Sequence, residues 1–143
     1  MLELAAERTR GAHPYLVPPE HTARAREVLG KDAWLCPEQM VLLETDPEKA
    51  RRIARQNLGV YTSLPNYQNN LKEYGFSDAD FEDGGSDELV DRIVAWGDEQ
   101  VIRERIQAHW DAGADHVCIQ PLRSDGAPGA DLELLEALAP AAG

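Results

Sequence analysis

Two stretches of this sequence follow the same order of helix, glycine–alanine, short apolar segment and proline. They are ERTRGAHPYLVPP, residues 7–19, and HWDAGADHVCIQPL, residues 109–122. In each, apolar residues at helical spacing end at the glycine, and the apolar segment that follows is too short for another helix. A third apolar segment, Met40–Glu44, leads directly into a helix. Nearly all-apolar strands that alternate with helices predict an α/β fold, with parallel strands covered by helices.

The predicted strands are Ala12–Val17, Met40–Glu44 and His116–Gln120. Helices are predicted over residues 1–10, 20–29, 45–64, 65–75, 86–96, 98–110 and 131–140. Several have clear start signals, such as Asp46 as N-cap followed by proline in the first turn. Three parallel strands leave two unpaired edges and too little sheet to bury about seven helices. We therefore expect the chain to be the second part of a larger fold.

Composition excludes several classes of partner. The chain has 143 residues, enough for one domain over 1–143, and a formal net charge of −12 with a pI of about 4.6. An acidic surface repels phosphate backbones, so no nucleic acid is expected. No apolar segment approaches the roughly 20 residues of a membrane helix, and a cytoplasmic protein is expected. Cys36 and Cys118 lie in apolar segments and are predicted to be reduced, buried thiols.

Several stretches in the same order resemble the C-terminal half of the bacterial luciferase-like oxidoreductases, and most closely the members that use the deazaflavin coenzyme F-420. The stretches are MLELAAERTRGAHPYLVPPEHTARAREVLG, CPEQMVLLETDPEKARRIAR, LPNYQNNLKEYGF and LVDRIVAWGDEQVIRERIQAHWDAGADHVCIQPL. The resemblance extends from Met1 to about Pro140 and implies part of a (β/α)8 TIM barrel. The three predicted strands would be strands six to eight of that barrel.

The resemblance also implies an activity. Family members transfer a hydride between F-420, or FMN in the flavin-dependent monooxygenases, and a small organic substrate. Barrel strands one to five are expected to be missing, and so is the glycine-rich turn that holds the coenzyme phosphate. We therefore expect the chain alone to bind coenzyme weakly and to be inactive. The alternative is a non-catalytic half-barrel that forms a homodimer or pairs with a chain supplying the missing barrel half.

Candidate site residues follow from the strand ends, because ligands of parallel α/β sheets lie at the carboxyl ends of the strands. His13 and Tyr15 share one face of a predicted strand near that end. They could line a coenzyme or substrate cleft, or be a buried, satisfied pair. Gln120 ends the last predicted strand and could hold a flavin-like ring edge or a ribityl hydroxyl, or only fasten its own loop.

Other polar residues are interpreted structurally. Glu38 and Gln39 precede the predicted strand at Met40, which places them at the incoming end of the strands, where polar groups serve stability. A strand that begins at Trp34 would place them nearer the carboxyl ends. The asparagines of PNYQNN, residues 65–70, could form a substrate wall, but helix capping and bonds between helices are the favoured interpretation. The histidine and cysteine spacings predict no metal site, the acidic loop DADFEDGGSDE does not match an EF-hand, and no catalytic residue is assigned.

Overall fold

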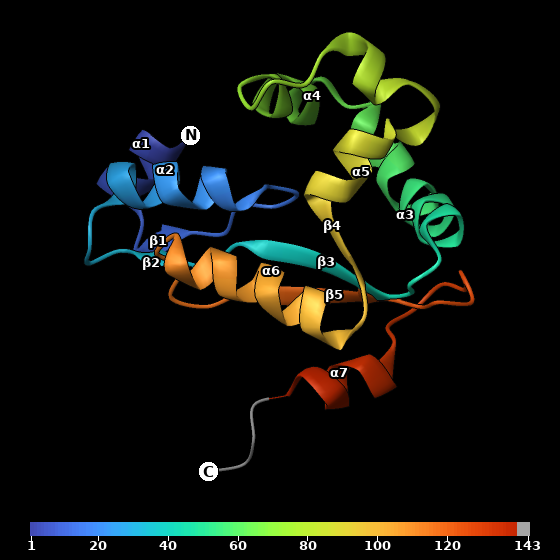
Figure 1. Ribbon diagram of the computed structural model, residues 1–143. Coiled ribbons are helices and arrows are strands. Elements are labelled where there is room, and N and C mark those ends of the chain that lie inside the picture. The colour runs from blue at the N-terminus through green and yellow to red at the C-terminus, as the bar shows by residue number, and fades with distance from the viewer. Residues whose placement is uncertain (140–143) are drawn as a thin grey trace.

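The computed structural model describes residues 1–139 as eight helical segments and five short strands (Figure 1). The helical segments are α1 (Leu2–Arg8), α2 (Pro19–Leu29), α3 (Pro47–Thr62), α4 (Pro65–Lys72), the 3-10 segment η1 (Asp78–Gly84), α5 (Asp87–Ile93), α6 (Glu99–Asp111) and α7 (Leu132–Leu138). The strands are β1 (Gly11–Ala12), β2 (Trp34–Leu35), β3 (Glu38–Leu43), β4 (Val94–Gly97) and β5 (Cys118–Leu122). The predicted helices are found, apart from a few residues at their ends and residues 94–96, which form a strand. The last predicted helical residue, Pro140, lies outside the described residues.

All strand pairs are parallel, as predicted. β1 pairs with β2, and β3 lies between β4 and β5. Only Cys36 and Pro37 separate β2 from β3, and the hydrogen-bond ladder continues across them. The Cys36 N–H donates to the Ala12 carbonyl at 3.0 Å, and the Glu38 N–H donates to the Pro14 carbonyl at 2.9 Å. Residues 34–43 therefore form one interrupted central strand, with β1 and then β4 along one edge and β5 along the other.

The strand predictions need three corrections. The first predicted strand, Ala12–Val17, is only two residues long because the chain turns away after Pro14 and Leu16 has a positive φ of 58°. The last one begins at Cys118 instead of His116. β4 was predicted as the end of a helix, although α5 stops at Ile93 and the strand follows at once. Within residues 1–139 the sheet is open, so its membership in a (β/α)8 barrel, of which this chain would be a part, stays a prediction.

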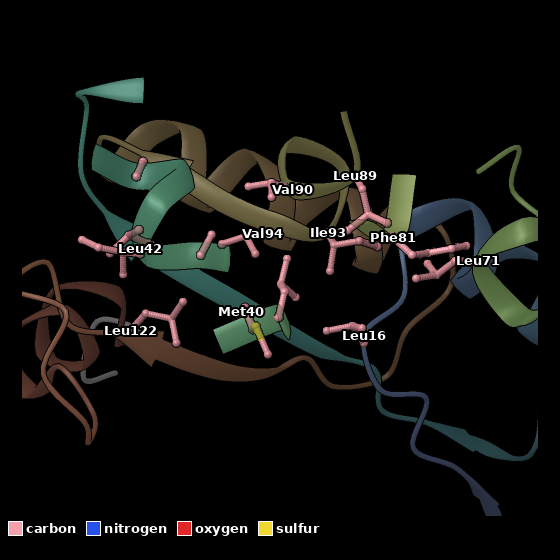
Figure 2. Close-up of a cluster of buried hydrophobic side chains, with 14 of the residues drawn as sticks. Leu16, Met40, Leu42, Leu71, Phe81, Leu89, Val90, Ile93, Val94 and Leu122 are labelled. Carbon is pink, nitrogen blue, oxygen red and sulfur yellow. The ribbon is translucent and has the colours of Figure 1, made fainter. Parts of the chain in front are cut away.

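One face of the sheet carries the main hydrophobic core. Because side chains alternate along a strand, Met40 and Leu42 point to the same face, where Leu122 of β5 joins them. Helices α3, α4 and α5 and segment η1 cover this face with buried side chains that include Leu58, Leu71, Phe81, Leu89, Val90 and Ile93 (Figure 2). Burying each such side chain contributes about 1.5–3 kcal/mol, so this layer fixes the position of α3 and α4 above the sheet.

The opposite face is covered by α6 and α7. Val41, Ala95 and Ile119 point to it and pack with buried residues of both helices, Ile102 and Leu134 among them. A third, smaller cluster of Ala25, Leu29 and Leu35 joins α2 to β2, with residues of α1 packed against it. Every helix within residues 1–139 is too short or too polar to span a lipid bilayer.

A buried polar chain connects three elements behind the sheet. Gln39 donates two hydrogen bonds of 2.8 Å, to the carbonyls of Met40 and Ile93, and its Oε1 lies 3.0 Å from His109 Nε2. Since that amide oxygen can only accept, Nε2 of His109 carries a proton. His109 is fully buried, and burial lowers its pKa to about 4, so Nδ1 is free to accept from the Thr22 hydroxyl at 2.8 Å. The prediction that Gln39 serves stability fits this arrangement.

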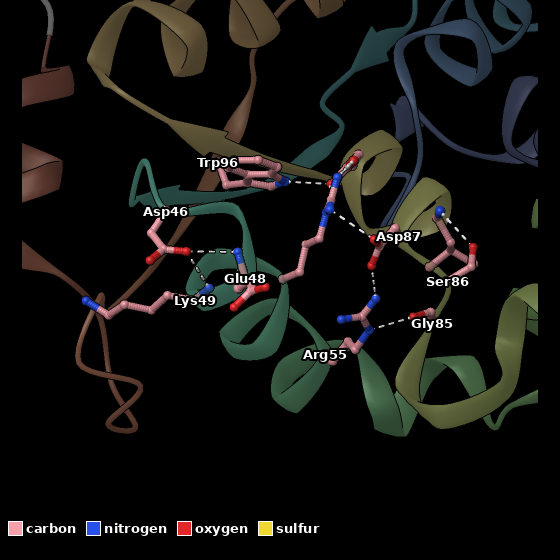
Figure 3. A network of polar contacts seen from close by, with 11 residues as sticks. Asp46, Glu48, Lys49, Arg55, Gly85, Ser86, Asp87 and Trp96 are labelled. Atoms are coloured by element: carbon pink, nitrogen blue, oxygen red, sulfur yellow. Dashed lines mark hydrogen bonds and ion pairs between the residues drawn. The ribbon is translucent and has the colours of Figure 1, made fainter.

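Arginines of α3 fasten it to α5. Arg51 forms a bidentate ion pair with Asp91, with Nε 3.0 Å from Oδ1 and Nη2 2.6 Å from Oδ2. Trp96 Nε1 donates to the same carboxylate at 2.8 Å. One turn along, Arg55 binds Asp87 and the Gly85 carbonyl (Figure 3). The predicted N-cap Asp46 is confirmed, because its carboxylate accepts from the backbone of Glu48 and Lys49 (Figure 3). These contacts set the start and the tilt of the helix that carries Tyr61.

Candidate functional site

A groove with a volume of about 540 Å³ lies where the chain leaves β1, between α1, the start of α2 and α4. Its walls are mainly apolar and aromatic, with a few polar groups. The residues that line it are Met1, Leu2, Ala5, Ala12, His13, Pro14, Tyr15, Val17, His21, Asn66, Tyr67 and Asn70. Volumes of roughly 300–1,000 Å³ with mostly apolar walls are typical of small-molecule sites. Because this groove adjoins the outgoing end of β1, it is the candidate site.

Tyr15 anchors one wall of the groove. Its hydroxyl donates to Gln120 Oε1 at 2.6 Å and lies 3.2 Å from the Tyr61 hydroxyl, which must then be the donor of that second bond. The rings of Tyr15 and Tyr61 are 5.4 Å apart, and Tyr67 packs edge-on against Tyr61 at 5.2 Å. Burial and the Tyr61 hydrogen bond raise the pKa of Tyr15, so its hydroxyl stays protonated and keeps these partners.

Two of the three predicted site residues line the groove, and the third lies behind it. His13 is exposed on the groove wall, and its Nδ1 makes a short hydrogen bond to the Cys36 carbonyl. Tyr15 is half-buried in the same wall. Gln120 is not among the lining residues, but it fixes the Tyr15 hydroxyl from β5. The structure therefore brings Tyr15 and Gln120 together by a hydrogen bond, whereas the hydrogen bond of His13 is to the Cys36 carbonyl.

Glu38 lies within the interrupted central strand, and it has the structural role that the sequence analysis favours. It begins β3, is only 5% exposed, and has one oxygen, Oε2, that accepts from the Leu16 N–H at 3.2 Å. Its other oxygen, Oε1, is buried and has no hydrogen-bond partner in the part of the chain that the structure describes. Burial raises the pKa of Glu38 to about 7, and the carboxylate lies close enough to Tyr15 for its charge to act on that hydroxyl. The only sequence signal was the condition that the strand begins at Trp34, as it does.

The same carboxylate holds a strained turn. Leu16 is buried and has a φ of 58°, the left-handed region that L-residues other than glycine and asparagine seldom adopt. Strain of this kind costs on the order of 1–3 kcal/mol and persists only where the surroundings impose it. Here Glu38 binds the Leu16 N–H while the Leu16 side chain enters the core (Figure 2). The turn directs Tyr15 toward Gln120.

The asparagines of α4 do not have the predicted capping role. The N-cap of α4 is Leu64, without a side-chain hydrogen bond, and within residues 1–139 the side chains of Asn66, Asn69 and Asn70 make no hydrogen bond to the protein. Asn66 and Asn70 instead line the groove, which is the interpretation that sequence reasoning disfavoured. Nothing in the described part of the chain groups three or more metal-binding side chains. Cys36 and Cys118 are free, as predicted, but half-buried.

The fold defines a class of protein: parallel α/β proteins with a groove at the outgoing end of a strand. No family model matches the sequence, and no curated protein matches it. Among solved structures, the fold is similar to an F420-dependent secondary alcohol dehydrogenase in complex with an F420-acetone adduct. The TM-score is 0.60 at 13% sequence identity, and the match covers 97% of this chain and 46% of that chain. The chain thus spans under half the length of this neighbour, and the likeness concerns the fold.

Proposed function

We propose that this chain supplies part of the coenzyme and substrate site of an oxidoreductase that uses deazaflavin coenzyme F-420. The supporting observation is the aromatic groove beside Tyr15 at the outgoing end of the sheet. The fold likeness to a dehydrogenase that uses this coenzyme and the sequence resemblance favour the same activity. FMN is the alternative coenzyme. A small secondary alcohol or its ketone is the proposed substrate class.

The groove has the walls that a flat ring system requires. Tyr15 and Tyr67 offer ring faces or edges, Val17 offers apolar contact, and His13 and Asn70 offer polar atoms at the margin. When bound, the coenzyme would accept the hydride of the alcohol carbon, while the alcohol proton passes to a base and a ketone remains. The contribution of this chain is to orient the ring, to exclude water from one side, and to hold the Tyr15 proton on its hydroxyl.

We expect F-420 to bind to the chain weakly, with a Kd on the order of 0.1–1 mM, because the groove is open and covers one side of a ring only. Tyr15→Ala should weaken binding at least tenfold, and His116→Ala, at an exposed position outside the groove, should not change it. The measurement is an NMR titration of the tyrosine ring signals. Unchanged affinity in Tyr15→Ala would show that the ring lies elsewhere, and the proposed site would be withdrawn.

A second candidate function is a half-barrel that pairs with another chain. Its support comes from β5 and β2. Ala130 and Asp131 cover the outgoing end of β5, but within residues 1–139 the side of β5 away from β3 is unpaired over residues 118–120, and Trp34 of β2 is 59% exposed. Unpaired strand edges favour association. Light scattering after size exclusion should then give twice the 15.8 kDa of one chain, and Trp34→Glu should shift the protein to monomer. Trp110→Glu on α6 is the matched control, and a monomeric parent chain contradicts this candidate.

A further inference from the structure

The groove continues into a second, more polar hollow of about 410 Å³. The two share five lining residues: Met1, Leu2, His21, Asn66 and Asn70. The other residues of the polar hollow are Glu3, Arg24, Val28, Asn69, Glu73 and Tyr74. The aromatic groove and the polar hollow are therefore the two ends of one elongated depression between α1, α2 and α4.

Two buried polar atoms in the walls of the polar hollow have no hydrogen-bond partner among residues 1–139. One is Nδ1 of His21, a residue only 7% exposed, and the other is the hydroxyl of Tyr74. The two rings lie against each other, with centroids 5.7 Å apart and a tilt of 49°. The Arg24 guanidinium is near the Tyr74 hydroxyl but makes no hydrogen bond of acceptable geometry with it. Unsatisfied buried polar atoms are rare and indicate a missing partner.

Further polar groups in the polar hollow are available to a ligand. Asn66, Asn69 and Asn70 lie on α4 at spacings of three and four residues, so they share one helix face. Within residues 1–139 their side-chain amides have no protein partner. The charges in the hollow nearly cancel, because Arg24 is ion-paired with Glu73. Burial, with Arg24 nearby, lowers the pKa of His21, so its ring is neutral at pH 7 with one donor and one acceptor nitrogen.

We propose that the polar hollow binds a neutral chain of hydroxyl groups, as in a polyol. A hydroxyl both donates and accepts, so it can satisfy His21 Nδ1 in either tautomer, the Tyr74 hydroxyl, and both ends of an asparagine amide. An anion would meet carboxylates and a cation already engaged by Glu73. An apolar ligand would leave the buried polar atoms unsatisfied.

Such a chain of hydroxyls can have two sources. It can be a free polyol, or it can be the ribityl chain of a deazaflavin or flavin whose ring occupies the aromatic groove. The second source rests on the proposed function, and the first does not. Because the groove and the hollow share lining residues, a single molecule can extend from Tyr67 at one end to Tyr74 at the other.

The test follows the imidazole signals of His21 by NMR in the 143-residue chain. Three probes are used: ribitol, the deazaflavin ring with its ribityl chain (the ribityl deazaflavin), and the same ring with a methyl group in place of the ribityl chain. We expect ribitol or the ribityl deazaflavin to shift these signals saturably, with a Kd on the order of 1–10 mM for ribitol. His21→Phe, which keeps a ring against Tyr74, should weaken binding at least tenfold, and here the ring signals of Tyr74 are followed in both the parent and the variant. His116→Phe, at an exposed position, is the matched control.

The outcomes separate this proposal from the proposed function. A His21 shift with ribitol identifies a free-polyol site, whether or not any ring compound binds. A shift with the ribityl deazaflavin but with neither ribitol nor the methyl compound identifies the ribityl chain as the occupant. If no probe shifts the His21 signals, or if the methyl compound shifts them as strongly as the ribityl deazaflavin, the polyol site is refuted. Equal binding of both ring compounds would then still support the aromatic groove as a ring site.

Discussion

Glu38→Gln is expected to increase the free energy of unfolding by about 3 kcal/mol at pH 8 and to leave it nearly unchanged at pH 4.5. Burial raises the pKa of Glu38 from 4.5 in the unfolded chain to about 7 in the folded one. Between these values the folded state holds the extra proton, so the stability of the parent protein falls as pH rises. A shift of about 2.5 units corresponds to about 3 kcal/mol, and the amide removes this cost.

The measurement is urea unfolding at a series of pH values between 4.5 and 8. Glu27→Gln, on the exposed side of α2, is the matched control and should follow the parent curve. If Glu38→Gln also runs parallel to the parent throughout this range, the carboxylate is ionised in the folded protein at low pH, and the account of its burial is wrong. Because Glu38 binds the Leu16 N–H, its ionisation is also expected to change the environment of Tyr15.

The second large effect is acid sensitivity from His109. Its pKa falls from 6.5 to about 4 on folding, because burial disfavours the charged ring. Below pH 6.5 the His109 imidazole binds a proton in the unfolded chain but not in the folded protein. The free energy of unfolding therefore declines as pH falls from 6.5 to 4. The expected decline is about 3 kcal/mol, and it is best seen in the Glu38→Gln background, where the opposing slope is absent.

His109→Gln in that background should remove this decline. Glutamine keeps one donor and one acceptor for Gln39 and Thr22, so the buried chain of hydrogen bonds can survive. His21 titrates in the same direction, and its part of the slope remains in both proteins, so the difference between them isolates His109. His116→Gln serves as control, and a decline equal in the two proteins would assign the acid sensitivity to other groups.

The helices were predictable because their signals are local. Asp46 is an N-cap in the structure as predicted, and the N-caps Ser86 and Asp98 likewise accept from a backbone N–H of the first turn. Strand ends were less predictable, because they depend on partners distant in the sequence. β4 follows α5 without any turn residue, so its apolar residues continue the helical pattern. The prediction ends the last strand at Gln120, before Pro121, yet Pro121 lies inside β5, which has β3 on one side only.

The site was predictable in its position but only partly in its members. The rule that ligands lie at the carboxyl ends of parallel strands identified Tyr15 and Gln120, which the structure joins by a hydrogen bond. The burial of Glu38 was not predictable because it depends on the turn at Leu16, and no local pattern predicts a positive φ at a leucine. The exposure of the α4 asparagines likewise depends on the docking of α1 and α2 opposite them.

The interrupted central strand also determines when the sheet can form during synthesis. β3 pairs with β4 more than 50 residues later in the chain, and with β5 80 residues later. Contacts this distant in sequence make folding slow, because long loops must close before the pairing is gained. Until the segment around Leu122 has left the ribosome, Met40, Val41 and Leu42 therefore have an open backbone edge. The nascent chain should depend on chaperones during this interval.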